Sequence, residues 1–194
     1  MPRPLDCLSG LLMAAIAGAA TSSGAAAPKA AQAGKPGEVA TRGQREAKDI
    51  SYGSWEKLCF RAGGAPILCR TSITGQFATG QTAVRLDLIQ REDAPTARLQ
   101  LFVPAGMYLQ YVPKLSVDNG GVVRLPYTWC LANLCVAADI ATPTMIKEME
   151  TGKVLVLEVV DSNLLALTTS IPLAQFASVH RGAPARTLEQ YIDE

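Results

Sequence analysis

The sequence predicts an all-β fold: an antiparallel β-sandwich of about nine short strands with two short helices and two local disulfides. Three observations support this prediction. Apolar and polar residues alternate with a period of two along several segments, turn-forming residues separate these segments, and four of the five cysteines form two close pairs in the sequence. Many short strands with frequent turns are typical of sandwiches and barrels rather than of α/β folds.

The N-terminal segment, residues 1–27, has the layout of a secretory signal peptide. Arg3 precedes a 13-residue apolar run over residues 8–20, and small residues follow at 17–19 and 25–27, so that more than one cleavage site fits. The alternative is an uncleaved anchor, but a membrane-spanning helix needs about 20 apolar residues. Cys7 lies before the apolar run rather than after it, so we expect it to leave with the signal rather than to carry a lipid.

Residues 28–49 are rich in Ala, Gly, Lys, Gln and Pro and contain almost no large apolar side chain. Such a composition predicts a flexible leader, because it cannot bury enough surface to offset the entropy of ordering. A tether to an envelope layer is an alternative use of the leader. Residues 50–182 have the size of one domain. Residues 183–194 form a C-terminal tail that would dock as a further turn of helix or fray.

Two segments of the domain, residues 82–90 and 97–103, show the period-two pattern most clearly. Arg91–Thr96, a charged and Pro-containing connection, separates them, which predicts a hairpin. Turn residues such as Asp118 and Asp161 bound other strands. The remaining strand candidates are residues 53–60, 66–74, 109–117, 122–130, 134–138, 153–160 and 164–171.

Two helices are predicted from their terminal residues. Thr142 can cap a helix that has Pro143 at its first position and Gly152 at its end. Pro172 precedes a second helical segment that ends near Gly182. Both segments are short, so they interrupt the β-structure without changing the fold class.

The two cysteine pairs predict disulfides Cys59–Cys69 and Cys130–Cys135, because each pair brackets one short turn between strand candidates. Four cysteines allow three connectivities, and local pairing requires the fewest assumptions. A four-thiolate zinc site is the first alternative, but the two-residue spacing of zinc knuckles is missing. A thioredoxin-like redox pair is the second, but it has two intervening residues rather than the four between Cys130 and Cys135.

At these residues the chain resembles the invasion-associated locus B family of alphaproteobacteria. The resemblance covers nearly all of residues 50–182 and is carried by five segments: Gly-Ser-Trp at 53–55, the first cysteine pair, Val-Pro-Ala-Gly at 103–106, residues 125–135 with the second cysteine pair, and residues 171–176. It implies an exported, disulfide-bonded β-sandwich of the bacterial envelope that is linked to host-cell invasion or colonisation. The family offers no established catalytic motif to carry over.

An enzymatic function finds little support in the residues. His180 is the only histidine, and the end of a helix, where a cation is favourable, explains it. Glu148 and Glu150 are two apart on a helix and face different directions. Neither a metal-ligand spacing nor a glycine-rich phosphate loop is present, and the net charge of +1 gives no basic stripe for nucleic acid. We therefore expect no enzyme, cofactor, metal or nucleic-acid partner; a periplasmic hydrolase or lyase with an unrecognised site is the alternative.

A binding surface is the preferred functional hypothesis. Residues 104–113 are apolar on both alternating sets, which predicts partner-binding roles for Met107, Tyr108 and Tyr111. The alternative is that this segment is a strand buried on both sides or crosses the open end of the sandwich. Trp55 and Trp129 are expected to fill the core. The sequence thus predicts an exported periplasmic binding protein, in one version associated with the outer membrane, with a protein partner in the envelope or on a host cell. Peripheral membrane association and a role as accessory subunit of an envelope complex stay open.

Overall fold

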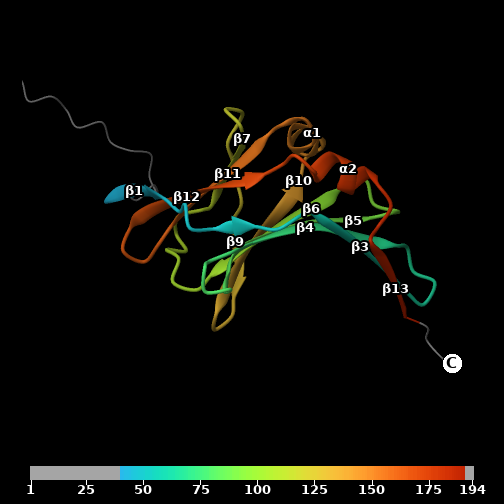
Figure 1. The fold of residues 1–194 in the computed structure, drawn as a ribbon. Helices are drawn as coiled ribbons and strands as arrows, with labels where there is room; N and C mark the ends of the chain where they lie inside the picture. Colours follow the sequence, from blue (N-terminus) through green and yellow to red (C-terminus); the bar gives the residue numbers. More distant parts are fainter. Residues whose placement is uncertain (1–39, 191–194) are drawn as a thin grey trace, which may run out of the picture. The chain divides into compact units, whose positions relative to one another are not determined.

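Two β-sheets and two short helices enclose the main core in the computed structural model, which describes residues 40–190 (Figure 1). The predicted signal peptide, Cys7 and the last four residues of the predicted tail lie outside the described residues. The mostly β architecture with two helices and two local disulfides confirms the predicted fold class.

The larger sheet has eight strands and is antiparallel except at one edge. Its order is β13-β3-β4-β5-β6-β10-β9, with β2 paired to β4, and only the edge strand β13 runs parallel to its neighbour. The predicted hairpin is confirmed as β5 and β6. The strands are β2 (Ser51–Tyr52), β3 (Glu56–Ala62), β4 (Leu68–Gln76), β5 (Thr82–Arg91), β6 (Ala97–Pro104), β9 (Tyr127–Cys130), β10 (Leu134–Ala141) and β13 (Arg186–Gln190).

The smaller sheet has five strands in the order β1-β12-β11-β7-β8. Its central strands are antiparallel, and the edge strand β1 is parallel to β12. The strands are β1 (Gly43–Glu46), β7 (Lys114–Val117), β8 (Val123–Arg124), β11 (Val154–Val160) and β12 (Leu165–Pro172).

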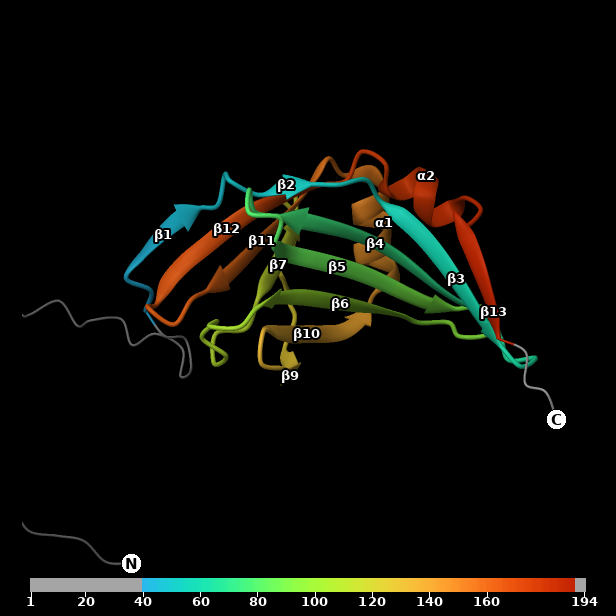
Figure 2. The same ribbon diagram turned by 60° about the horizontal axis from the view of Figure 1, so that its bottom comes forward.

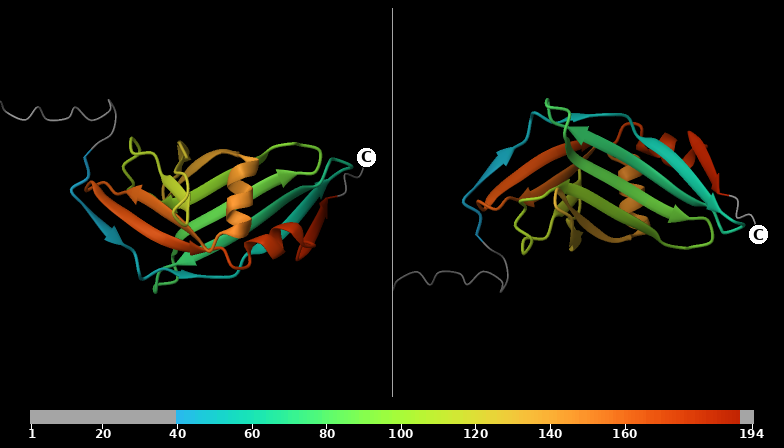
Figure 3. Two further views of the ribbon diagram at one scale, coloured as in Figure 1. Left: turned by 90° about the horizontal axis from the view of Figure 1, so that it is seen from above. Right: turned by 90° about the horizontal axis from the view of Figure 1, so that it is seen from below.

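The smaller sheet and the helices α1 (Pro143–Thr151) and α2 (Phe176–Arg181) cover one face of the larger sheet (Figure 3). Side chains from all these elements form the core on that side. Its largest fully buried members are Phe176, Ile73, Leu86, Leu88, Leu99, Leu101, Leu115, Leu125, Met149, Leu155, Leu157 and Ile171. Within residues 40–190, no helix or second sheet lies over the opposite face of the larger sheet (Figure 3, right).

Helix α1 begins and ends at the predicted residues. The Thr142 hydroxyl accepts a hydrogen bond from the Met145 backbone N–H at 3.2 Å, which satisfies one of the free N–H groups of the first turn. Gly152 follows the last turn with an extended backbone, and the position requires glycine because a Cβ would lie 2.2 Å from Val117 Cγ1. Helix α2 begins later than predicted, at Phe176, and ends before Gly182 as expected.

The structure differs from the sequence-based expectation at both ends of the domain. Strand β1 lies within residues 28–49, which composition predicted to be a flexible leader, and β13 lies within the predicted tail as a strand rather than a helical turn. Every residue of both strands is exposed, so neither carries an apolar pattern. Backbone pairing with β12 and with β3 holds them instead.

The predicted strand over residues 109–117 is shorter in the structure. Only Lys114–Val117 form strand β7, because Pro113 has no N–H to donate to a neighbouring strand. Before it, the Tyr111 N–H donates to the Tyr108 carbonyl and forms a turn. The doubly apolar segment therefore crosses from the larger sheet to the smaller one as a connection, not as a strand.

Candidate functional site

Both predicted disulfides are present. Cys59–Cys69 joins the paired strands β3 and β4, and Cys130–Cys135 joins β9 and β10 at the tight loop between them. Each cysteine is directly opposite its partner in the strand register, so each bridge joins the two strands of a hairpin covalently near its turn. All four of these cysteines are in disulfides, so they form neither a four-thiolate zinc site nor a free redox pair.

The two tryptophans near these bridges have different environments. Trp55 is buried, donates its indole N–H to the Pro172 carbonyl at 2.8 Å and packs edge-on against Phe176. Trp129 is 48 % exposed, so the expectation that it fills the core is wrong. It lies on β9 as the cross-strand neighbour of Val136, on the uncovered side of the larger sheet.

The uncovered side of the larger sheet, which we call the open face, carries a regular row of side chains. Direct cross-strand neighbours share a face of a sheet, so the register places six residues in one line across six strands. Arginine and apolar residues alternate strictly along this arginine row: Arg186, Leu58, Arg70, Ile89, Arg98 and Ile140. Alternate strands are about 10 Å apart, so the backbone positions of the three arginines are spaced evenly across the sheet.

The three arginines of this row have few partners within the described residues. The side chains of Arg98 and Arg186 are exposed and form no hydrogen bond or ion pair there. Arg70 Nε is 4.0 Å from the Asp87 carboxylate, too far for a hydrogen bond, and it is buried without any other acceptor. Asp87 is itself buried and is bound through both oxygens by Arg85. Arg70 and Arg85 thus share the single carboxylate of Asp87, and Arg98 and Arg186 have no acidic partner within residues 40–190, so the row presents an excess of positive charge there.

Large apolar side chains flank the arginine row on the same face. Leu188, Phe60 and Leu68 are cross-strand neighbours on β13, β3 and β4 and are 53 %, 39 % and 39 % exposed. Ile140, at the end of the arginine row, is 61 % exposed. On the other side of the row Arg85 stacks over Phe102, with 4.9 Å from its Cζ to the ring centroid. Exposed apolar residues gathered on one face indicate a contact surface.

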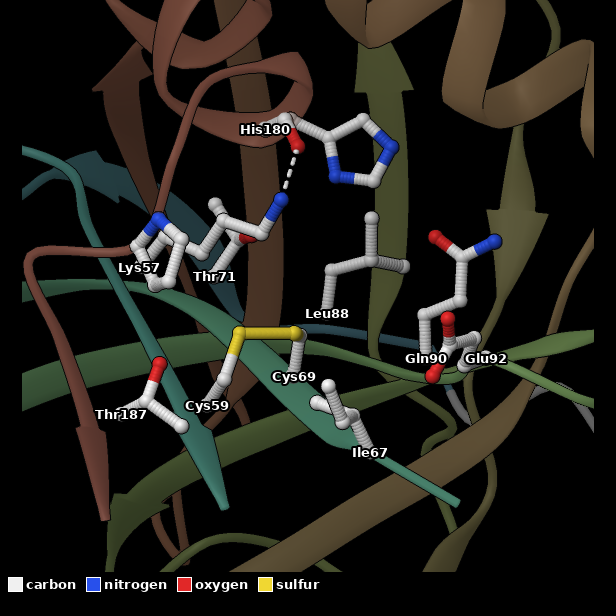
Figure 4. A pocket seen from close by; sticks show the side chains of 11 residues that line it. Lys57, Cys59, Ile67, Cys69, Thr71, Leu88, Gln90, Glu92, His180 and Thr187 are labelled. Carbon is white, nitrogen blue, oxygen red and sulfur yellow. Dashed lines mark hydrogen bonds between the residues drawn. A yellow bond between two sulfur atoms is a disulfide. The ribbon is translucent and has the colours of Figure 1, made fainter. Parts of the chain in front are cut away.

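A cavity of about 390 Å³ lies on the covered side of the same sheet, beside the first disulfide (Figure 4). The disulfide, Ile67 and Leu88 give it apolar walls, and Lys57 and His180 border it from β3 and α2. The Lys57 ammonium donates to the carbonyls of His180 and Gly182, at 2.8 and 3.0 Å. Lys57 thus binds the C-terminal carbonyls of α2, where a cation is favourable.

His180 lies in the last turn of α2, as its place in the sequence predicted. Its ring stacks parallel to the Phe176 ring with centroids 5.3 Å apart. Burial lowers the pKa of the imidazole below its ordinary value, the nearby Glu150 carboxylate opposes this shift, and Lys57 and Arg181 reinforce it. Glu150 is bound by Arg181, which lowers the pKa of that carboxyl. No serine or cysteine nucleophile hydrogen-bonds to His180 within residues 40–190.

The predicted partner-binding residues have unequal exposure. Met107 and Tyr108 are half-buried, whereas Tyr111 is only 7 % exposed and belongs to a small second core cluster with Val160 and Ala166. The Tyr111 hydroxyl donates to Glu158 and accepts from Lys114. Burial and the hydrogen bond to Glu158 raise the pKa of the Tyr111 hydroxyl. The environment of Tyr111 is that of a core residue; partner-binding roles for Met107 and Tyr108 stay a prediction.

The open face was not identified from the sequence, although a signal existed. Ile89, Phe102 and Ile140 occupy positions whose neighbours along the strand point to the core, so they break the alternation of apolar and polar residues. Their gathering on one face depends on the strand order, which the sequence does not give. Within residues 40–190, no group of three or more His, Cys, Asp or Glu side chains could hold a metal ion. In the same residues no helix is long and apolar enough to cross a membrane.

Two sheets around one main core, two local disulfides and an arginine-rich open face define a small disulfide-stabilised β-protein with a surface suited to contact. The family model described as invasion associated locus B (IalB) protein matches residues 55–184. The chain belongs to the IalB family. The crystal structure of invasion associated protein b from Bartonella henselae is similar, with a TM-score of 0.59, 19 % sequence identity, and coverage of 67 % of this chain and 90 % of that chain. This likeness shows the fold.

No curated protein matches the chain. The disulfides and the family membership together indicate an extracytoplasmic protein. The match to the family model confirms the resemblance inferred from the cysteine-containing segments of the sequence.

Proposed function

We propose that the protein is an exported, non-enzymatic binding protein of the bacterial envelope that acts through the open face of its larger sheet. The observation that carries this proposal is the arrangement of that face: three arginines that have no hydrogen-bond partner within residues 40–190 alternate with apolar side chains, and further large apolar residues flank them. Arginine and aromatic residues are enriched at interfaces. A monomer gains nothing for its own stability by exposing this combination.

Family membership supports an envelope role, because proteins of this family are linked to the invasion of host cells. The sequence supports export through the signal-peptide layout of residues 1–27, which predicts a periplasmic protein or one associated with the outer membrane. Catalysis is disfavoured because the only histidine packs against Phe176 and a helix end rather than facing a nucleophile. The accessory-subunit role is a special case of the same binding activity.

The test compares the envelope association of the wild-type protein with that of two triple variants. The open-face variant R70Q/R98Q/R186Q removes the three charges of the arginine row. The matched control R42Q/R45Q/K147Q removes the same net charge from β1, from the residue next to it and from α1. After cell fractionation, the open-face variant should move from the envelope to the soluble fraction at equal melting temperature, while the control stays. If both variants fractionate like the wild type, the open face is not the functional surface and the proposal is wrong.

A further inference from the structure

We propose that the partner of the open face is an anionic phospholipid surface, whose phosphates the arginine row binds while the flanking apolar side chains enter the headgroup layer. This inference rests on the proposed function, since it names the partner of the same surface. It is carried by the geometry of the face: which residues share it, how they alternate, and which charges on it are already neutralised.

The charge of the open face favours an anionic partner. Arg70, Arg98 and Arg186 are set on alternate strands, and the one buried carboxylate among them, Asp87, is already bound by Arg85. Glu56 lies at the edge of the face, one row away. The planar guanidinium group has two parallel donors that match two phosphate oxygens, so it suits phosphate better than a lysine does.

The distribution of apolar residues favours a lipid layer over an acidic protein. Protein interfaces have an apolar centre and a polar rim. On the open face the two kinds of side chain alternate from strand to strand instead, and the most exposed apolar residues lie far apart, at Leu188 on the edge strand β13 and at Ile140 on β10. A headgroup layer offers anionic and apolar contacts side by side over its whole area, so an alternating surface fits it.

The open face is accessible to a partner. The two helices and the smaller sheet are all on the other side of the larger sheet, so they leave the rows accessible (Figures 2 and 3). Trp129, on the edge strand β9, adds an aromatic side chain at the rim of the face. Tryptophan is enriched at the level of lipid headgroups because its ring is apolar with one polar N–H.

The experiment measures binding of the full mature chain to large vesicles by co-sedimentation at physiological ionic strength. Vesicles of phosphatidylcholine with one third phosphatidylglycerol are compared with pure phosphatidylcholine. Each basic residue near an anionic surface contributes about fivefold to binding, so R70Q/R98Q/R186Q should lower it on the order of a hundredfold. The control R42Q/R45Q/K147Q should lose far less, since its charges lie off the open face. F60S/L188S should weaken binding at every salt concentration, because it removes apolar contacts rather than charge.

Three outcomes would overturn the lipid proposal: no preference for phosphatidylglycerol, equal loss in both triple variants, or retention by the open-face variant. Polyglutamate serves as a lipid-free acidic probe. If the wild type binds polyglutamate but not vesicles, and the open-face variant binds neither, the partner is an acidic protein. The envelope association in cells separates the two proposals, because its loss in the open-face variant would uphold the binding function even where the vesicle experiment fails.

Discussion

The two faces of the larger sheet are built from the same strands but carry different patterns of side chains. Along β5, Leu86 and Leu88 point to the core and are almost fully buried, while Arg85 before them and Ile89 after them point to the open face. The covered face follows the hydrophobic pattern strictly, because each apolar side chain there stabilises the fold. The open face mixes arginine with leucine, isoleucine and phenylalanine, and stability gives no reason for that mixture. The residues of the covered face therefore specify the fold, whereas the residues of the open face are available for contact with a partner.

The largest expected effect comes from shortening a side chain on the covered face. Leu99→Ala should lower the free energy of unfolding by about 3–5 kcal/mol, because Leu99 is completely buried beside Leu88 and leaves a cavity. Ile140→Ala on the open face should change it by less than about 0.5 kcal/mol, since Ile140 is exposed. Urea unfolding of both variants checks the pair. A large loss at Ile140 would mean that the open face is buried against something in the isolated protein.

Tyr111 and Tyr108 offer a second comparison, between a buried and a half-buried aromatic residue in one segment. Tyr111→Ala should destabilise the protein by about 3 kcal/mol, because it opens a cavity beside Val160 and leaves Glu158 and Lys114 without their hydroxyl partner. Tyr108→Ala should cost clearly less. Thermal and urea unfolding are measured together with binding to envelope fractions. Weaker envelope binding by Tyr108→Ala at near-normal stability would support its predicted partner-binding role; loss of binding only in proportion to stability would contradict it.

The two disulfides should differ modestly. Cys59 and Cys69 are 10 residues apart in sequence and Cys130 and Cys135 are 5 apart, so the chain-entropy model gives about 3 and about 2 kcal/mol for the two bridges. The variants C59S/C69S and C130S/C135S, unfolded in urea, measure both. The first bridge also borders the cavity under α2, so its loss should loosen β13 and the end of β3, as amide exchange would show. A larger loss from the shorter ring would contradict the entropic account.

The sequence predicted the features that depend on local residues. The β class, the β5–β6 hairpin, the ends of α1 and both disulfides follow from alternation, turn residues, capping and cysteine spacing. Features that depend on long-range pairing were missed. Strands β1 and β13 are held by backbone hydrogen bonds to distant strands and carry no side-chain pattern.

The open face was missed for the same reason. The alternation of Arg186, Leu58 and Arg70 exists only across strands, because β13 pairs with β3 over more than a hundred residues of sequence. Trp129 is a single-residue example of what the sequence alone does not predict. A large aromatic beside a cysteine predicts a core position, but the Cys130–Cys135 bridge and the edge position of β9 leave its ring on the surface.

The smallest expected effect is a pH dependence on the covered side, where His180 lies between the core and the cavity. The pKa of His180 is held below its ordinary value of 6.5, first by burial and then by the charges of Lys57 and Arg181, while Glu150 raises it. The unfolded chain therefore binds the proton more readily than the folded one. The contribution to stability is complete above pH 6.5 and is lost as the pH falls through 6.5 toward the lower pKa of the folded state.

Two measurements test the predicted direction of this pH dependence. Because His180 is the only histidine, its imidazole signal in a proton NMR titration is unambiguous, and its midpoint should lie below pH 6.5. His180→Phe, which keeps a ring stacked on Phe176, should lose less stability than the wild type between pH 7.5 and pH 5.5. Glu150→Gln should shift the midpoint further down by removing the opposing carboxylate. A midpoint above 6.5 in the wild type would mean that Glu150 outweighs burial and that acid stabilises this end of the protein instead.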